Sequence, residues 1–277
     1  MIAFASNSLL CRAALKQTSI DAASFTFVRI FSGAVALWLI VNVRRSTGPI
    51  YPRVGGNWIS ALALVFYAAA FSFAYLDVAV GTGALLLFGS VQATMILWGL
   101  HKGESVRAIQ IVGLIVAMMG LVVLLFPGVS APPLFGSILM LGAGIAWGIY
   151  SLRGKREKNP TTVTAGNFVR AVPFAAAVSI IFVPRIHFDS AGVTYGIISG
   201  AITSGLGYIL WYAALPSLKA ASAASVQLIV PLLAATGGIL LLGEPLTLRY
   251  LLASVAILGG IALVILERTR ACSGGKA

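Results

Sequence analysis

Phe27-Val28-Arg29 returns in this chain as Phe168-Val169-Arg170, and Gly103-Glu104 returns as Gly243-Glu244. The copies of the first motif lie 141 positions apart and those of the second lie 140 positions apart. A nearly constant offset indicates a duplicated unit whose two halves align almost without gaps. Most of the sequence between the motifs is apolar, so the repeated unit is expected to be a bundle of membrane helices.

The composition sets the fold class. Of the 277 residues, 59% are hydrophobic and 9% are charged, and the mean hydropathy is +1.00. A chain of this length cannot bury so much apolar surface in water, and in lipid its backbone must satisfy its own hydrogen bonds. With about 20 apolar residues per crossing, we predict an all-α membrane protein with ten transmembrane helices. The expected spans are 1–16, 22–43, 57–76, 79–100, 106–126, 134–152, 162–183, 191–214, 220–242 and 247–266.

Two five-helix repeats form the expected domains, at residues 1–128 and 132–268, followed by a cytoplasmic tail at 269–277. The Phe126-Pro127-Gly128 turn marks the join. Because five is an odd number of crossings, the two copies must enter the membrane from opposite sides, and the repeats are expected to be inverted. An inverted pair can exchange conformations around a central site, which favours secondary transport. The alternative is a duplication kept for packing only, as in a non-transporting membrane scaffold subunit.

The formal net charge of +12 is explained by its distribution along the chain. If the N-terminus is cytoplasmic, 13 of the 19 Lys and Arg residues fall on the cytoplasmic side. They are Arg44, Arg45, Arg53, Lys102, Arg107, Arg153, Lys155, Arg156, Lys158, Lys219, Arg268, Arg270 and Lys276. This positive-inside bias predicts a multi-pass protein of the inner (plasma) membrane with both termini in the cytoplasm. The expected partners are the lipid bilayer and a small-molecule substrate, with no nucleic acid, and the protein is expected to be a monomer or a homodimer.

Polar groups inside the apolar runs are the first candidates for a site, since each must find a partner or line a water-filled cavity. Asn7, near the centre of the first expected helix, could hydrogen-bond a substrate. Together with Ser6 and Ser8 it could equally serve tight packing between helices. In the fourth and ninth expected helices, Gln92 and Gln227 are further possible hydrogen-bonding groups.

Aromatic residues share a face on two of the expected helices. Trp147 and Tyr150 are three positions apart, and Tyr208, Trp211 and Tyr212 fall at i, i+3 and i+4, so each set lies on one side of its helix. Such a face could bind an apolar or aromatic group of a substrate, or it could face lipid as an interfacial belt. We favour cavity lining because Trp147 and Tyr208 lie deep in their apolar runs.

Arg29 and Arg170 occupy equivalent positions of the two repeats, inside helices where an unpaired guanidinium is costly. They could attract a substrate carboxylate, act as gates, or form a symmetric clamp to backbone carbonyls or to acids such as Asp21 or Asp77. Because inversion places them toward opposite membrane faces, they cannot both bind one central carboxylate, and we favour a structural role. Pro231, which frees a backbone carbonyl in the ninth expected helix, is a third gating or structural candidate.

The acidic residues all fall at expected helix ends or in loops; they are Asp21, Asp77, Glu104, Glu157, Asp189, Glu244 and Glu267. No carboxylate is therefore expected at mid-membrane to relay protons or to neutralise a cationic drug. His101 and His187 also lie near loops, without metal-ligand spacing or a nucleophile–base pair. We accordingly expect no enzyme activity, no metal and no cofactor, and the alternative of a multidrug or cationic solute–proton antiporter is weakened.

The motif Gly243-Glu244-Pro245-Leu246, and its weaker copy Gly103-Glu104-Ser105-Val106, resemble the end of the fourth helix in repeats of the EamA family. This family belongs to the drug/metabolite transporter superfamily. Ala146-Trp147-Gly148, the Phe-Val-Arg phrase of each half and Pro231 also resemble the family pattern, in the same order over nearly the whole chain. The resemblance implies ten helices, cytoplasmic termini, a central cavity between the repeats and frequent use as an exporter of amino acids or related metabolites.

The first repeat departs from that pattern, with Val91 where Pro231 aligns and Ala5-Ser6 where Trp147-Gly148 align. Small multidrug members of the superfamily carry a membrane carboxylate in their first helix, which Ser6-Asn7-Ser8 does not match. The resulting hypothesis is an exporter of a small neutral or zwitterionic metabolite such as an amino acid. Its expected cavity residues are Asn7, Gln92, Trp147, Tyr150, Tyr208, Trp211 and Gln227.

Overall fold

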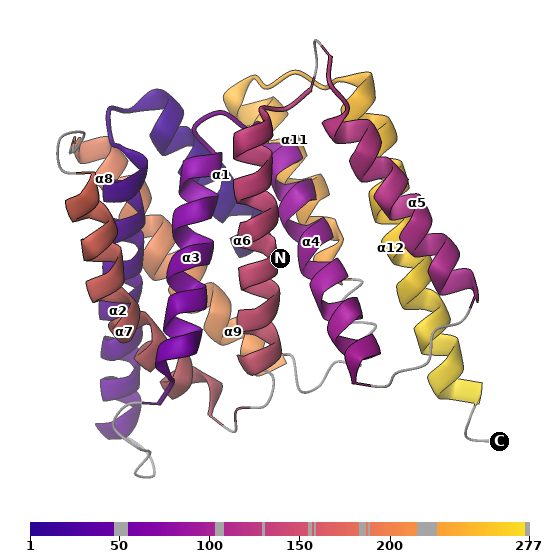
Figure 1. Cartoon of the computed structure of the whole chain (residues 1–277). Coiled ribbons are helices and arrows are strands. Elements are labelled where there is room, and N and C mark those ends of the chain that lie inside the picture. Colours follow the sequence, from indigo (N-terminus) through magenta and orange to yellow (C-terminus); the bar gives the residue numbers. More distant parts are fainter. Residues whose placement is uncertain are drawn as a thin grey trace.

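The computed structural model describes residues 1–46, 55–102, 108–128, 131–154, 157, 159–182, 187, 189–214 and 226–274. These residues form helices and connecting turns, without a strand. The helices are α1 (Ile2–Gln17), α2 (Ala22–Ser46), α3 (Trp58–Ala74), α4 (Val80–His101), α5 (Ala108–Leu125), α6 (Leu134–Gly154), α7 (Pro160–Ile181), α8 (Ser190–Ile197), η2 (Ile198–Leu206), α9 (Gly207–Ala214), α11 (Ile229–Leu242) and α12 (Leu248–Gly274). They lie side by side as one bundle (Figure 1).

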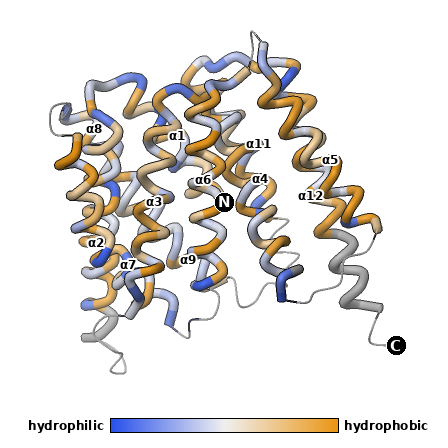
Figure 2. Tube along the Cα trace, viewed as in Figure 1, coloured by the Kyte–Doolittle hydropathy of each residue, from blue (hydrophilic) through white to orange (hydrophobic). Residues whose placement is uncertain are grey.

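Seven helical segments of the described residues are long and apolar enough to cross a membrane. They are Ala22–Val43, Val80–Gly99, Ala108–Leu125, Leu134–Gly154, Pro160–Ile181, Ser190–Ala214 and Leu248–Ile265. Two shorter apolar helices, α3 and α11, stand among them, and apolar residues run along most of the bundle in Figure 2. The predicted all-α membrane class is confirmed, whereas the count of ten crossings in two repeats stays a prediction.

Several helix ends differ from the expected spans. α7 begins at Pro160, before the expected residue 162, because Asn159 caps the helix and proline suits its first turn. α12 runs on to Gly274 and so continues through most of the segment expected as a tail. The expected ninth helix, 220–242, is described from residue 226 onward, and residues 220–225 lie outside the described residues.

Local sequence explains where several helices start and stop. Asn57, Asn159 and Asp189 accept backbone N–H bonds at the starts of α3, α7 and α8, which satisfies donors that have no partner within the helix. α11 ends at Gly243, whose φ of +64° is the left-handed conformation that glycine adopts at low cost. Pro245 follows at once and cannot continue the helix.

The packing of the helices brings the two halves of the chain together. α2 packs on α7, α5 on α12, α4 on α11, and α6 lies against both α3 and α4. α1 packs against α8, η2 and α11. α2, α4, α6, α8 and α12 all begin at the upper end in Figure 1, so that the chain alternates in direction. The core between these helices therefore draws side chains from both halves of the sequence.

Candidate functional site

Asn7 lies at the centre of a buried hydrogen-bond network. Its side chain is 3% exposed, and its Nδ2 donates to the Tyr67 hydroxyl at 3.4 Å. Its Oδ1 accepts from Ser199 Oγ at 2.5 Å and from Thr203 Oγ1 at 3.3 Å. Asn7 thus joins α1 to α3 and to η2.

η2 is a π-helix, which is rare and is frequently found at functional sites. Gly200 allows it to approach α2 closely, since a Cβ at Gly200 would meet the backbone oxygen of Arg29 at 2.1 Å. Ser199, Thr203 and Ser204 are all buried on this helix. Their hydroxyls supply the polar surface that faces Asn7 and Arg29.

An aromatic cluster lies beside this network; we define it as Phe4, Tyr67, Trp147, Tyr208 and Trp211. The ring centroid of Trp147 lies 4.7 Å from that of Tyr208, 5.0 Å from that of Tyr67 and 5.8 Å from that of Phe4. Phe4 also faces Trp211 at 6.1 Å. The aromatic faces predicted for two separate helices therefore meet inside the protein, and each ring is at most 9% exposed. These residues therefore do not form a lipid-facing belt.

Tyr150 extends the cluster along α6. Its ring stacks on Trp147 at 5.6 Å, and its hydroxyl accepts from Asn167 Nδ2 at 3.5 Å. The ring of Tyr212 lies 6.5 Å away. Tyr150 is thus buried between α6, α7 and α9, at the edge of the cluster.

Gln92 and Gln227 are brought to each other. Gln92 Nε2 donates to Gln227 Oε1 at 3.5 Å, and both side chains are buried. This bond joins α4 to the segment before α11. Pro231 lies three residues after Leu228, at which the helical hydrogen bonding is interrupted. Because proline has no N–H, it leaves the backbone carbonyl of Gln227 without its usual helical donor.

Arg29 is 1% exposed. Among the described residues, its hydrogen bonds are not to Asp21, Asp77 or a backbone carbonyl, which were the partners expected from the sequence. Its Nη2 donates to the Tyr67 hydroxyl at 3.0 Å and its Nε to Ser204 Oγ at 3.2 Å. The guanidinium carbon also lies 5.2 Å from the ring centre of Tyr67 and 4.9 Å from that of Phe71. Arg29 is therefore held by hydroxyls and aromatic faces.

Arg170 has the surroundings of the expected clamp. Its Nη1 donates to the backbone oxygen of Gly55 at 2.6 Å and to that of Gly166 at 3.0 Å. The guanidinium carbon lies 5.8 Å from the ring centre of Trp58. This arginine joins α7 to the chain that enters α3.

Tyr67 and Phe4 are site residues that the sequence interpretation missed. Tyr67 is the acceptor for both Asn7 and Arg29. The signal was present, because a tyrosine hydroxyl in the middle of an apolar run is subject to the same rule that selected Asn7. Phe4 gave no such signal, since an aromatic residue in a membrane helix most often faces lipid or core.

A second polar cluster lies at the upper end of the bundle. Arg12 Nε and Glu244 Oε1 form an ion pair at 3.2 Å, and Glu244 Oε2 accepts from the backbone N–H of Val80 at 2.7 Å. Arg12 Nη1 also donates to the backbone oxygens of Tyr75 and Leu76, at 2.7 and 2.6 Å. The cluster ties α1, the end of α3, the start of α4 and the α11–α12 turn together.

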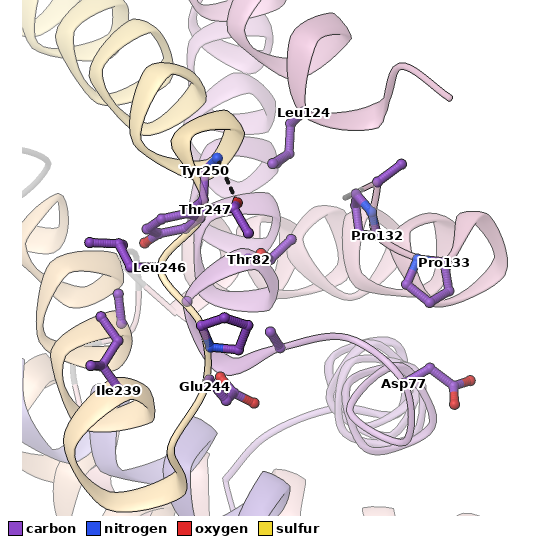
Figure 3. Close-up of a pocket in the computed structure, with 15 residues that line it drawn as sticks. Asp77, Thr82, Leu124, Pro132, Pro133, Ile239, Glu244, Leu246, Thr247 and Tyr250 are labelled. Atoms are coloured by element: carbon purple, nitrogen blue, oxygen red, sulfur yellow. Dashed lines mark hydrogen bonds between the residues drawn. The ribbon is translucent and has the colours of Figure 1, made fainter. Parts of the chain in front are cut away.

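Next to this cluster is a cavity of about 350 Å³, shown in Figure 3. It lies between the start of α4, the connection from α5 to α6, and the turn from α11 to α12. Glu244, Thr82, Thr247 and Tyr250 line it together with Asp77. None of the site residues expected from the sequence is among its lining residues. The residues expected to form the site are instead buried in the core of the bundle.

The comparisons with known proteins fit this helical fold. The EamA-like transporter family matches residues 134–266. An uncharacterized protein of Pseudomonas aeruginosa is 54% identical over 97% of this chain and 92% of its own length. The threonine/homoserine exporter RhtA of Escherichia coli is 33% identical over 56% of this chain and 54% of its own. A solved crystal structure has the same fold, with a TM-score of 0.66 and 19% identity over 96% of this chain and 97% of that one.

The protein is thus an all-α membrane protein by fold and a transporter by relationship. The chain belongs to the EamA-like transporter family.

Proposed function

We propose that the protein is a secondary transporter that exports a small neutral or zwitterionic metabolite, such as an amino acid, by alternating access. The observation that carries the proposal is that the buried hydrogen-bond network of Asn7 lies directly beside the aromatic cluster, with Tyr67 belonging to both. Polar groups inside a membrane protein are costly and mark substrate pathways. Here they lie beside a large apolar aromatic surface, which is the combination that a small amphipathic solute requires.

The proposed architecture is ten crossings in two inverted repeats, 1–128 and 132–268. Exchange of the repeats pairs α1 with α6, α2 with α7, α3 with the α8–η2–α9 segment, α4 with α11, and α5 with α12. The observed packing is consistent with this exchange, because α2–α7, α4–α11 and α5–α12 are each in contact. The contact of α3 with α6 is likewise matched by that of α1 with α8 and η2.

The proposed orientation places both termini in the cytoplasm and the protein in the inner membrane. In that orientation the lower end in Figure 1, where α2, α4 and α6 end, faces the cytoplasm, and 13 of the 19 Lys and Arg residues belong to the cytoplasmic side of the chain. The ion pair of Arg12 and Glu244 then lies at the outer end. Because the core cluster is closed in this structure, either end must open for a substrate to enter.

The substrate class rests on the cluster and on one relative. RhtA, which matches 56% of this chain, is named as a threonine/homoserine exporter. A cationic drug would meet the positive charge of Arg29 in the core, which disfavours the multidrug alternative. The outward direction of transport is proposed from the relative alone.

Counterflow in proteoliposomes, with a panel of labelled amino acids, tests this function. We expect exchange of at least one amino acid by the wild-type protein, and its loss in Tyr208→Ala and Trp211→Ala variants that remain folded. The matched control is Trp38→Ala, since Trp38 is 56% exposed on α2 and should face lipid. Normal exchange by both cluster variants would contradict the proposed site. A protein that moves no solute and copurifies with a second polypeptide in fixed ratio would instead be a scaffold subunit.

A further inference from the structure

We infer that Arg29 is the anchor for the carboxylate group of the zwitterionic substrate, so that binding requires the carboxylate whereas the amino group is dispensable for binding. This inference rests on the proposed transport function and deepens it. Arg170, at the equivalent position of the second half, has no such role.

The first observation is the charge balance around Arg29. The guanidinium is 99% buried, yet its recorded contacts are with the hydroxyls of Tyr67 and Ser204 and with two aromatic rings. In the part of the chain that the structure describes, the recorded ion pair is that of Arg12 and Glu244. A buried positive charge without a carboxylate is costly, and an anionic ligand would relieve that cost.

The second observation is the set of donors without acceptors. Arg29 Nη1 and the Tyr208 hydroxyl are both buried and have no hydrogen-bond partner among the described residues. Arg29 donates to the Tyr67 hydroxyl, the ring of Tyr67 packs on Trp147, and Trp147 packs on Tyr208. Since arginine cannot lose its proton in a protein, its free N–H groups call for an acceptor. A carboxylate accepts from a guanidinium and from a hydroxyl at once.

The third observation is the position of Tyr208 between the two parts of the site. Its ring lies 4.7 Å from that of Trp147 and 5.8 Å from that of Phe168. A carboxylate at Arg29 would therefore direct the rest of the molecule toward the aromatic cluster. The side chains recorded in contact with this cluster carry no carboxylate for a substrate ammonium group. The charged group of the substrate that the site recognises is therefore its carboxylate, through Arg29.

Arg170 supplies the internal comparison. Its Nη1 already donates to two backbone carbonyls, at 2.6 and 3.0 Å. Because these bonds link α7 to the chain before α3, we assign Arg170 to packing and not to ligand binding. The same tripeptide motif therefore supports packing in one half and an anion site in the other.

Ligand-induced thermal stabilisation of the purified full-length protein tests the inference. The probes are L-threonine, L-leucine and L-phenylalanine, each measured beside its methyl ester, its decarboxylated amine and the corresponding acid without the amino group. We expect stabilisation by at least one amino acid and by its deaminated acid, but not by the ester or the amine. Equal stabilisation by the amine or ester, or none by any carboxylate, would overturn the inference.

Variants connect that result to Arg29. Arg29→Gln should weaken the apparent affinity for the carboxylate roughly 30-fold or more, as expected when one partner of a buried charge pair is removed. Arg29→Lys, which keeps the charge without the planar fork, should retain part of the affinity. Arg170→Lys is the matched control and should bind as the wild type does. If Arg29→Gln does not fold, the test rests on Arg29→Lys and on the probe series with the wild-type protein. An unchanged affinity in Arg29→Lys, together with equal wild-type affinity for the amine and the acid, would contradict a carboxylate anchor at Arg29.

The two proposals can fail separately. Stabilisation by carboxylates without any counterflow would reject transport of these solutes and leave the anion site standing. Counterflow of the decarboxylated amine at the rate of its amino acid would keep the transporter and reject the anchor.

Discussion

Arg29 and Arg170 begin from the same tripeptide and end in different surroundings. Arg170 donates to the backbone oxygens of Gly55 and Gly166. Arg29 is held by the hydroxyls of Tyr67 and Ser204, between aromatic rings, with one nitrogen unpartnered among the described residues. A guanidinium satisfied by carbonyls is part of the scaffold. One that is buried with a free donor is available for a ligand, so equivalence in sequence does not extend to role.

The largest expected difference between the two arginines is in transport. Arg29→Gln should lower the initial rate of counterflow roughly 30-fold or more, because it removes the charge that would pair with the substrate. Arg170→Gln should keep the rate per folded molecule within about 2-fold. It should instead lower stability by about 1–3 kcal/mol, because two carbonyls lose a charged donor. Counterflow and thermal unfolding on the same preparations measure both effects, and a reversed pattern would reject the distinction.

The shared acceptor Tyr67 sharpens the comparison. Tyr67→Phe removes the oxygen to which Asn7 and Arg29 both donate, leaving two buried donors without it. We expect a loss of about 1–3 kcal/mol in stability, seen as a lower unfolding temperature. Tyr150→Phe is the control, since the Tyr150 hydroxyl accepts a long, neutral bond from Asn167 at 3.5 Å, and its effect should be smaller. A larger loss in Tyr150→Phe would contradict the central position of Tyr67.

Arg12 is a third arginine, and unlike Arg29 it has a carboxylate. Glu244→Gln keeps the shape of that partner but removes its charge, while Arg12 retains its two carbonyl acceptors. We therefore expect a loss of only about 1 kcal/mol, measured by thermal unfolding. Gly238 supports the contact, because a Cβ there would meet Glu244 Oε2 at 2.8 Å. Gly238→Ala should destabilise the protein in the same direction, and a stabilising effect of either change would reject the ion pair as a tie.

The smallest expected effect concerns Asp21, once considered as a partner for Arg29. Burial raises the pKa of Asp21, but hydrogen bonds from Ser24, His187 and Ala23 outweigh it and hold the pKa below its ordinary value. The stabilisation is therefore present above the unfolded pKa of about 3.9 and is lost as the pH falls through the folded pKa. Asp21→Asn should reduce this acid sensitivity of unfolding and leave counterflow unchanged. Loss of transport in Asp21→Asn would mean that Asp21 does act on Arg29.

Sequence patterns predicted the helical membrane class because composition and the length of apolar runs decide it. They also predicted that Trp147, Tyr208 and Trp211 face inward, since each set shares a helix face and lies deep in its run. The partners of Asn7 were beyond such reasoning. Ser199 lies 192 positions away in the chain, and a π-helix has no periodicity that the sequence displays. The hydrogen-bond partners of Arg29 and Arg170 could not be predicted for the same reason, because they depend on which backbone carbonyls or hydroxyl groups the fold brings near each guanidinium.

The most direct test of the account is counterflow by the wild-type protein and Arg29→Lys, comparing an amino acid with its decarboxylated amine in the same proteoliposomes. We predict that the wild-type protein exchanges the amino acid and not the amine, and that Arg29→Lys retains this preference at a reduced rate. Exchange of both solutes at equal rates, unaffected by the change at Arg29, would contradict a carboxylate site in the core.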